Sequence, residues 1–425
     1  MIKNMDYYDI ETEIITHLYT DIDTKNEYSE AFTPINLIEE LLDKLDNEVW
    51  SNPNLKWLEP ANGVGNFPMV VFDRLNKSLS NVILDEEERK THIIKNMLYM
   101  VELNEENVKI SQYIFGDDAN IYCGSFLDDG WKEAFGIDKF DLIIGNPPFN
   151  GKKYKRNLEY GTRANVNIWN EFIKKSLENL KYDGYLCFII PQTWRSVSTK
   201  FRNLWKIMSN KQITYLRIYG VNDCIKFFNV SFRIDLFIMK NRENNTETEI
   251  IDELGETHHI RLNELPFLAN YAYDDINKIL VNDNEEGIDV IFSYTKYFVW
   301  SKNHLFSKIK TNDYKYPVVH TINKDGVGLW YAKKDKKGHI GVAKVILNFN
   351  GIQYSYKEQN DYEGKYGMSQ ISFGIPISSK EEGDLILDAI QTPTFKKILA
   401  STKWKIFQTD YRMFRYFKKD WYKLI

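Results

Sequence analysis

The four residues Asn146-Pro147-Pro148-Phe149 form the segment of the sequence with the clearest chemical character. They directly follow an apolar run, residues 140–144, that is typical of a buried parallel strand. The two prolines fix the backbone and remove two N–H donors, so the carbonyl groups and the Asn146 side chain face outward as acceptors. Phe149 adds a flat apolar ring. This combination predicts a receptor for a planar amino group at the end of a strand, and a merely structural proline-rich turn is the less favoured interpretation there.

A second candidate segment is a glycine-containing turn, residues 59–67, with the sequence EPANGVGNF. Glycines allow the main chain to approach a ligand closely beside the start of a helix. With only Gly63 and Gly65 the turn does not match a dinucleotide-binding motif, and a purely structural strand–helix turn is an equally good interpretation. Glu102 ends the next expected strand, where a carboxylate can accept hydrogen bonds from both hydroxyls of a ribose. It could equally be an ordinary residue at a strand end.

Alternating strands and helices must bring these segments together. Thr33 and Pro34 are expected to open a helix whose apolar residues recur at helical spacing up to Leu45. The alternation of the remaining elements predicts a doubly wound α/β domain with the site at the carboxyl edge of its sheet. Strands are expected at residues 55–59, 98–101, 140–144, 185–190, 213–218 and 232–239, and helices at 84–95 and 168–180.

The acidic, asparagine-rich segment 241–256 is the expected linker. It divides the chain into a first domain, residues 1–240, and a second domain, residues 241–425, whose many aromatic residues and poorer periodicity predict mixed α/β structure. The net charge of −5 is the sum of unlike parts. Residues 296–344 carry +8 and residues 392–425 carry +7, whereas the rest of the chain is acidic. A basic C-terminal part suits contact with phosphates, although solvated faces explain basic runs equally well.

Composition narrows the class of protein further. Hydrophobic residues make up 43% and charged residues 27% of the 425 residues, as in an ordinary globular protein, and no apolar run is long enough to span a membrane. No signal peptide is visible, and the three cysteines fit neither a disulfide framework nor a zinc site. We therefore expect a cytoplasmic protein that binds no metal.

Residues 59–67 together with Asn146–Phe149 resemble the N6-adenine methyltransferases that use S-adenosylmethionine. The order of the motifs is similar to that in the gamma class of DNA methyltransferases from restriction–modification systems. Residues 30–34 and the block 169–194 also resemble segments of that family, so the resemblance covers about residues 28–240. It implies a Rossmann-like catalytic domain followed by a DNA target-recognition domain.

The resemblance also implies a set of cofactor-binding residues. Glu102 would bind the ribose of S-adenosylmethionine, and Ser125 and Phe126 would lie at its adenine. Family members usually carry an aspartate where this chain has Ser125, and Asp128 is a potential substitute. The other cofactor contacts that the resemblance implies are Phe32, Thr33, Pro34, Glu59, Ala61, Gly63, Gly65 and Asn146.

The four residues of the Asn-Pro-Pro-Phe motif are the catalytic residues that the resemblance implies. The Asn146 side-chain oxygen and the Pro147 carbonyl would accept hydrogen bonds from the adenine amino group, and these bonds strengthen as positive charge develops on its nitrogen. The base would have to leave the duplex to reach this site. It would then stack between Phe149 and Phe228, with Phe227 as the alternative partner, although either phenylalanine could equally belong to the core.

Double-stranded DNA is the expected partner, bound by an enzyme acting as a monomer, and a separately encoded restriction endonuclease is a further potential partner. Basic residues in the loop after the motif suit backbone phosphates, although a solvated loop is as good an interpretation: Lys152, Lys153, Lys155, Arg156. In residues 392–425 aromatic side chains interleave with nine basic ones, a mixture that favours base stacking and phosphate contact. About half of these aromatic residues are expected to be core: Phe395, Trp404, Phe407, Tyr411, Phe414, Tyr416, Phe417, Trp421 and Tyr422.

The leading hypothesis is thus a sequence-specific DNA adenine-N6 methyltransferase. One alternative is an RNA adenine-N6 or protein glutamine methyltransferase, because these enzymes share the Asn-Pro-Pro-aromatic motif. Another is a catalytically inactive, nucleic-acid-binding relative. Residues 361–365 contain an E-x-K pattern that also occurs in nucleases, but no plausible metal-binding aspartate precedes it, so we expect no cleavage activity.

Overall fold

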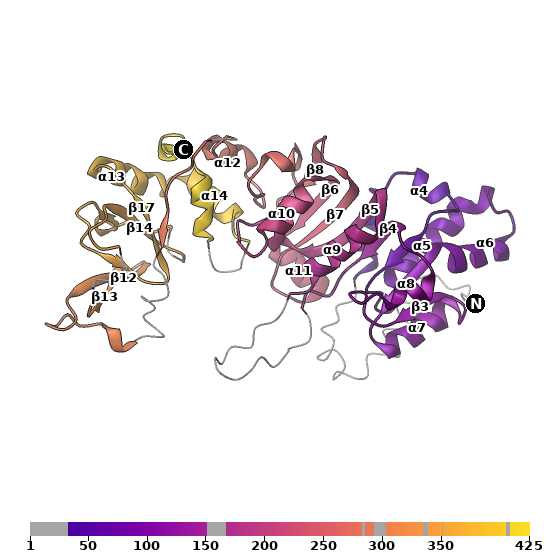
Figure 1. Cartoon of the computed structure of the whole chain (residues 1–425). Helices are drawn as coiled ribbons and strands as arrows, with labels where there is room; N and C mark the ends of the chain where they lie inside the picture. Colours follow the sequence, from indigo (N-terminus) through magenta and orange to yellow (C-terminus); the bar gives the residue numbers. More distant parts are fainter. Residues whose placement is uncertain are drawn as a thin grey trace. The chain divides into compact units, whose positions relative to one another are not determined.

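The computed structural model describes residues 33–150, 167–282, 285–292, 303–334, 339–350, 352–404 and 409–425. The chain divides into two compact units. The first unit comprises Met1–Gln192 and Lys206–Asn263, and the second comprises Thr193–Trp205 and Glu264–Ile425 (Figure 1). No helix in the described ranges is both long enough and apolar enough to cross a membrane.

A nine-stranded sheet forms the centre of the first unit. Its strands are β1 (Trp57–Glu59), β2 (Leu98–Glu102), β3 (Asn120–Cys123), β4 (Phe140–Gly145), β5 (Leu180–Pro191), β6 (Lys211–Tyr219), β7 (Ile234–Glu243), β8 (Thr248–Ile251) and β9 (Thr257–Ile260). Their order in the sheet is β3-β2-β1-β4-β5-β7-β6-β8-β9. The first five of these are parallel neighbours, and β7 lies antiparallel between β5 and β6.

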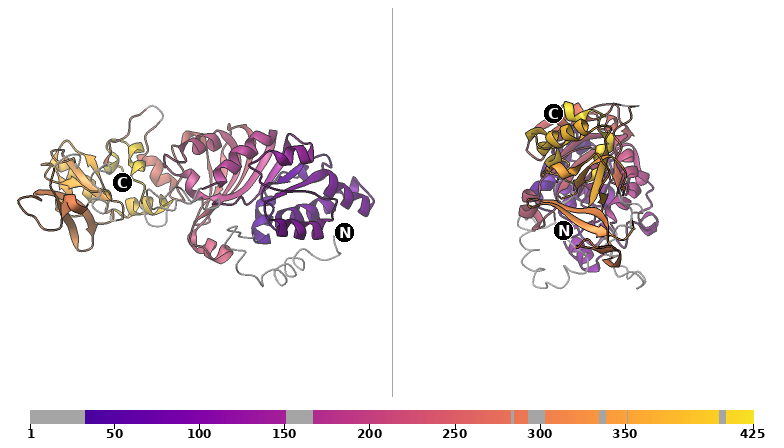
Figure 2. Two further views of the ribbon diagram at one scale, coloured as in Figure 1. Left: turned by 60° about the horizontal axis from the view of Figure 1, so that its bottom comes forward. Right: turned by 90° about the vertical axis from the view of Figure 1, so that its left-hand side faces the viewer.

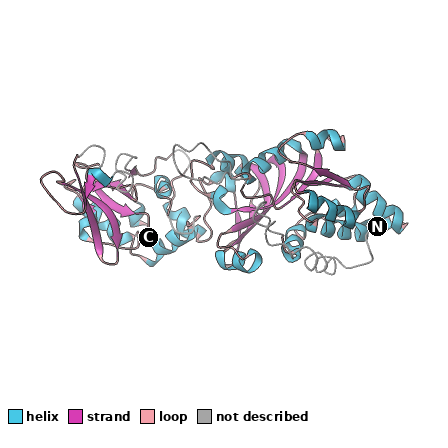
Figure 3. Cartoon of the chain, turned by 90° about the horizontal axis from the view of Figure 1, so that it is seen from below, coloured by secondary structure: helices cyan, strands magenta, loops and turns pink. Residues whose placement is uncertain are grey.

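Helices lie on both sides of this sheet, which confirms the doubly wound α/β prediction (Figure 3). On one side, apolar residues of α3 and α5 share a core with Leu142 and Ile144 of β4. The helices of the unit are α3 (Ile35–Leu42), α4 (Glu48–Ser51), α5 (Asn66–Ser78), α6 (Glu86–His92), α7 (Glu105–Phe115), α8 (Gly130–Phe135), α9 (Trp169–Asn179) and α11 (Val221–Phe228), while α10 (Arg202–Ser209) spans the division between the units.

The linker expected at residues 241–256 is wrong, because this segment belongs to the sheet. Strand β8 pairs in parallel with β6, and β9 returns antiparallel beside β8. Thr248 and Ile250 are buried, whereas three of the acidic residues that suggested a linker are exposed: Glu243, Glu247 and Glu256. The change from the first to the second unit therefore falls between Asn263 and Glu264 instead of at residue 240.

The described residues of the second unit form two four-stranded sheets, the α-helices α12, α13 and α14, and several short 3-10 helices (Figure 2, orange to yellow). The first sheet has the order β10-β17-β14-β15 and the second β11-β13-β12-β16. Val319 and Ile346, one from each sheet, meet in a shared core. The elements are β10 (Ile291–Phe292), β11 (Phe306–Ser307), β12 (Tyr316–Asn323), β13 (Gly326–Ala332), β14 (Lys344–Asn348), β15 (Asn360–Asp361), β16 (Gly367–Met368), β17 (Ser372–Pro376), α12 (Tyr273–Ile279), α13 (Lys380–Ala389) and α14 (Pro393–Ser401).

Most of the C-terminal aromatic residues belong to the core of the second unit. Phe395 stacks on Trp421 with ring centroids 4.8 Å apart, and Phe414 lies 5.0 Å from Phe417. These four rings and Trp404 are at most 2% exposed, so a base-stacking role for them is excluded. Tyr411, Tyr416 and Tyr422 are half-buried, and Phe407 lies outside the described residues.

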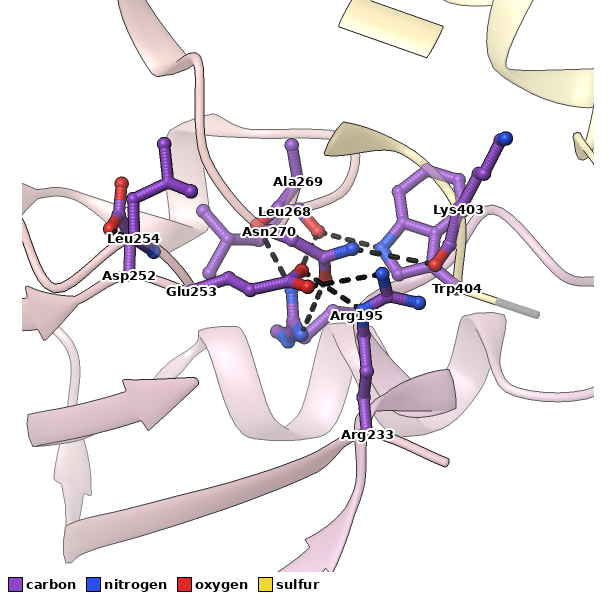
Figure 4. Close-up of polar contacts among 10 residues, drawn as sticks. All are labelled: Arg195, Arg233, Asp252, Glu253, Leu254, Leu268, Ala269, Asn270, Lys403 and Trp404. Atoms are coloured by element: carbon purple, nitrogen blue, oxygen red, sulfur yellow. Dashed lines mark hydrogen bonds and ion pairs between the residues drawn. The ribbon is translucent and has the colours of Figure 1, made fainter. Parts of the chain in front are cut away.

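The segment Thr193–Trp205 leaves the sheet after β5 and is fixed within the second unit by a buried arginine. The Arg195 guanidinium donates hydrogen bonds to the carbonyls of Leu268 and Ala269 at 3.1 and 2.9 Å and to Asn270 Oδ1 at 3.0 Å (Figure 4). In return, the Leu268 N–H donates to the Arg195 carbonyl at 3.1 Å. The two charged residues of the E-x-K pattern, Glu363 and Lys365, form an exposed ion pair with each other at 2.5 Å.

Candidate active site

The order of the strands brings the predicted site residues to one edge of the first unit's sheet. Glu59 is the last residue of β1, Glu102 is the last residue of β2, and Asn146 follows β4 directly. Because β2, β1 and β4 are parallel neighbours, their carboxyl ends lie side by side. Ser125 follows β3, the next strand along. The sequence therefore placed these segments correctly.

Glu59 is a buried carboxylate at the centre of this edge, with 2% of its surface exposed. Its Oε1 accepts a hydrogen bond from the Ala61 N–H at 3.1 Å, while Oε2 has no donor among the described residues. Burial raises the pKa of Glu59 well above its ordinary value, and the nearby Glu102 charge adds to this effect. A buried acid of this kind is stabilised as an anion only when a cation or strong donor reaches it.

A glycine allows Glu59 to lie against the end of β4. A β-carbon on Gly145 would lie 2.1 Å from Glu59 Oε1, closer than any real contact of this kind. The backbone of Gly145 also has a φ of +150°, which other residues rarely adopt. Gly145 thus lets a carboxylate occupy the space directly before Asn146.

Glu102 holds the glycine turn in place. Its Oε2 accepts from the Gly63 N–H at 2.6 Å and its Oε1 from the Asn104 N–H at 2.7 Å. Gly65, which ends the turn and precedes α5, has a left-handed φ of +99° that requires a glycine. Two backbone N–H groups, one for each oxygen, therefore fix the orientation of the Glu102 carboxylate.

Asn146 is fixed through its amide nitrogen. Its Nδ2 donates to Thr33 Oγ1 at 3.1 Å, and its Oδ1 is buried without a donor in the part of the chain that the structure describes. The Thr33 carbonyl in turn accepts from Asn66 Nδ2 at 3.0 Å. The expected capping role of Thr33 is wrong, because α3 begins after Pro34 and no side chain caps it. The Thr33 hydroxyl binds Asn146 instead.

Four buried acceptor oxygens lie in the segments that form this site. They are Glu59 Oε2, Asn62 Oδ1, Asn66 Oδ1 and Asn146 Oδ1, none of which has a donor within the described ranges. Unpaired buried acceptors are costly, so their concentration at one site indicates a ligand that brings several N–H or O–H donors and positive charge. Asn66 was not predicted from the sequence, because an asparagine at the start of a helix is normally interpreted as a local capping residue.

Phe149 and Phe228, the two rings expected to hold a base, each contact another phenylalanine. Phe149 is half-buried and lies edge-on to Phe232, with ring centroids 5.4 Å apart. Phe228 is half-buried and contacts Phe227 at 6.3 Å, while Phe227 packs edge-on against Tyr219 at 5.2 Å. Phe232 was not predicted, since a phenylalanine just before a buried strand is more often a core residue.

The two residues expected at the cofactor adenine have local roles. Ser125 Oγ accepts from the Leu127 N–H at 3.2 Å within a turn. Phe126 is 1% exposed and stacks on Trp131 with centroids 5.4 Å apart, and it also contacts Phe172 at the same distance. The prediction that Phe126 stacks on the cofactor adenine is therefore wrong, because core residues enclose its ring.

Of the remaining predicted residues, Pro34, Ala61, Pro147 and Pro148 lie in the segments just described. A further group lies outside the described residues: Phe32, Lys152, Lys153, Lys155 and Arg156.

Comparison with known proteins gives matches centred on this site. The family model described as the Eco57I restriction-modification methylase matches residues 82–227, which include β2, β4 and the Asn146 motif. An adenine-specific methylase of Mycoplasma pneumoniae, described as uncharacterized, is 28% identical over 50% of this chain and 67% of its own length. The modification methylase CviBIII of Paramecium bursaria Chlorella virus NC1A is 26% identical over 64% of this chain and 69% of its own. The tRNA1(Val) (adenine(37)-N6)-methyltransferase of Christiangramia forsetii is 31% identical over 36% of this chain and 59% of its own.

Proposed function

We propose that this chain, a DNA adenine methyltransferase related to the restriction–modification methylases, modifies adenine N6 at a specific DNA sequence with S-adenosylmethionine as methyl donor. The observation that carries the proposal is the state of the Asn146 amide. Its N–H side is held by Thr33 while its carbonyl side is buried and without a donor in the described structure. An amino group with two N–H bonds is the ligand that such an acceptor lacks.

The residues around Asn146 fit a cofactor with an ammonium group and a ribose. Glu59 presents a buried, unpaired carboxylate oxygen that would pair with the ammonium of the methionine part. Glu102 lies at the end of the adjacent strand with its carboxylate oriented by Gly63 and Asn104, where it would accept from the ribose hydroxyls. When bound, S-adenosylmethionine supplies an electrophilic methyl group on a sulfonium.

The chain's own residues would then act on the amino group. Asn146 Oδ1 and the Pro147 carbonyl would accept its two N–H bonds and favour a tetrahedral nitrogen with a localised lone pair. These bonds gain strength as the nitrogen becomes positive, so they stabilise the transition state more than the substrate. Phe149 would support the ring of a base that has left the duplex.

The second unit is proposed to recognise the DNA sequence, since the residues assigned at the catalytic edge of the first unit act on a single base. Duplex DNA is the proposed partner.

The decisive experiment measures transfer of labelled methyl groups to duplex DNA by Asn146→Ala. We expect transfer to be lost while calorimetry still detects S-adenosylmethionine. Asn54→Ala is the matched control, because Asn54 is exposed at the opposite, amino end of β1. Full transfer by the Asn146 variant would refute the assigned role. Transfer by the unaltered chain to RNA or to a protein glutamine in preference to DNA would replace the proposed substrate, and absence of cofactor binding would favour an inactive relative.

A further inference from the structure

The sheet β11-β13-β12-β16 of the second unit has two faces with different surroundings. Val319 of β12 and Leu329 of β13 belong to the core shared with the neighbouring sheet. Their chain neighbours Val318 and Trp330 belong to a separate small cluster on the opposite face. This is the alternation expected of a strand, so one face of the sheet is covered by the other sheet and the second face points away from it.

The outward face consists of aromatic and apolar side chains that are covered incompletely. Phe306, Val318 and Ala332 are buried there, at most 5% exposed. Trp330 and Tyr316 lie over them and remain half-exposed. The face therefore offers rings as well as backbone to a ligand.

Three lysines border this sheet. Tyr316 pairs with Ala332, so Lys315 and Lys333 lie opposite each other at one end of it. Ser307 pairs with Tyr331, so Lys308 follows the end of β11 beside Trp330. All three are exposed. Each ammonium lies over an aromatic ring: Lys308 over Trp330 at 5.4 Å, Lys315 over Tyr316 at 5.2 Å and Lys333 over Tyr314 at 4.9 Å.

None of these three lysines has a carboxylate partner in the described part of the chain, and the same is true of the exposed Lys310 and Lys324. Exposed lysines of the first unit are commonly paired, as Lys44 is with Glu249 and Lys174 with Glu171. The exposed Asp313 lies in the same segment but forms an ion pair with none of these lysines. The lysines therefore leave a net positive charge that an anionic ligand would neutralise. The rings beneath the ammonium groups limit their motion, so less conformational freedom is lost when an anion binds.

We propose that this lysine–aromatic face (Lys308, Lys315 and Lys333 with Tyr314, Tyr316 and Trp330) binds the phosphate backbone of duplex DNA. The inference rests on the proposed function, for which it names the contact surface. Phosphate is the anion that suits a row of unpaired lysines on a rigid sheet, and half-exposed rings suit the sugars beside it. The five aromatic rings buried near the C-terminus, by contrast, have no exposed face to offer.

The test uses the full chain with Lys308, Lys315 and Lys333 all changed to glutamine. Binding to a labelled duplex of arbitrary sequence is measured over a series of salt concentrations. We expect affinity to fall at least about tenfold, and the slope of log K against log salt to become less steep by about one unit for each phosphate that the variant no longer neutralises. The matching triple change to arginine keeps the charge and should retain most of the binding.

A matched control changes three exposed lysines elsewhere in the same unit, Lys357, Lys380 and Lys396, to glutamine. We expect this control to bind DNA nearly as the unaltered chain does. An equal decrease in affinity in both triple variants, or unchanged binding in the first, would overturn the assigned surface while leaving methyl transfer and the proposed function intact. If the unaltered chain bound RNA through these lysines but not duplex DNA, both the surface's partner and the proposed substrate would be wrong. Cofactor binding by calorimetry should be the same in all variants, which separates the surface from the catalytic site.

Discussion

The Asn146 amide donates a hydrogen bond to the Thr33 hydroxyl at 3.1 Å, although 113 residues separate the two in the chain. This bond decides which way the amide faces, because the nitrogen end is occupied and the oxygen end has no donor among the described residues. The Thr33 carbonyl simultaneously accepts from Asn66, which precedes the rest of α5. One threonine therefore links the start of the chain's described part, the glycine turn and the catalytic motif.

Replacing Thr33 by valine should slow methyl transfer more than it weakens cofactor binding. Valine keeps the shape of the side chain but removes the acceptor, so the Asn146 amide loses the bond that orients it. We expect the single-turnover rate to fall about tenfold or more, a smaller effect than removing a direct transition-state interaction would have. Thr33→Ser, which restores the hydroxyl, should recover most of the rate. Equal rates for the valine variant and the unaltered chain would show that the bond does not position Asn146.

Cofactor affinity should depend on pH through Glu59. Because burial raises the pKa of this carboxyl, part of the population carries a proton at pH values where ordinary glutamates are ionised. Pairing with an ammonium group requires the ionised form, so affinity should rise as pH increases through the raised pKa, with release of a proton on binding. Calorimetry in two buffers with different ionisation enthalpies measures that proton. Glu59→Gln should weaken binding and remove this proton release, whereas the exposed Glu48→Gln should change neither.

The same raised pKa has a consequence for the stability of the ligand-free protein. An acid whose pKa is higher in the folded chain than in the unfolded chain binds more protons when folded, so folding stability falls as pH rises from the ordinary glutamate range through the raised pKa. We expect Glu59→Gln to flatten this part of the stability–pH profile, measured by denaturant unfolding without cofactor. An unchanged profile would mean that Glu59 is not protonated in the free protein.

Gly145→Ala should disturb Glu59 specifically. The added β-carbon would lie 2.1 Å from Glu59 Oε1, so the carboxylate or the end of β4 must move. We expect cofactor affinity to fall at least tenfold and the free energy of unfolding to decrease. Gly136→Ala is the matched control, because Gly136 also has a positive φ, +63°, but an added carbon there meets no atom within 4 Å. The control should cost about 1 to 2 kcal/mol in stability through its backbone alone and leave cofactor binding unchanged.

Arg195→Met should destabilise the second unit without touching the catalytic edge. The change removes the guanidinium that donates to the Ala269 carbonyl and to Asn270 Oδ1, whereas the Leu268 carbonyl keeps the Trp404 indole N–H as a donor. Leaving buried acceptors unpaired costs about 1 to 3 kcal/mol for each group, so calorimetric scanning should show a clear decrease in Tm. Arg202→Met, at an exposed position seven residues later, should have little effect.

The sequence was informative where chemistry and backbone pattern coincide. Glu102 and Asn146 could be placed because each directly follows a strongly apolar segment, and parallel strands bring such ends to one edge. The roles of Thr33 and Asn66 could not be predicted, since their partners lie far away in the chain and local capping rules point to a different use. Phe126 illustrates a further limit, because a ring that stacks on a ligand and a ring enclosed by Trp131 have the same sequence signature.

The linker prediction failed for a related reason. Acidic and asparagine residues in 241–256 suggest solvent exposure, and the hairpin of β8 and β9 is indeed exposed along one side. Its pairing with β6 depends on only a few buried residues, among them Thr248 and Ile250. Short strands of this kind carry too little apolar periodicity to be separated from a loop by composition alone.

The segment Thr193–Trp205 belongs to the second unit, although it lies between β5 and β6 of the first unit in the chain. This affects how chimeric enzymes with altered specificity could be built. Trp194, Phe201 and Trp205 of this segment are at most 6% exposed within the second unit, yet they precede β6 of the first unit in the chain. A graft that exchanged only the residues after Asn263 would leave these side chains matched to a domain that is no longer present. If the second unit recognises the DNA sequence as proposed, specificity should be transferable between relatives only when the segment Thr193–Trp205 and the C-terminal part are exchanged together.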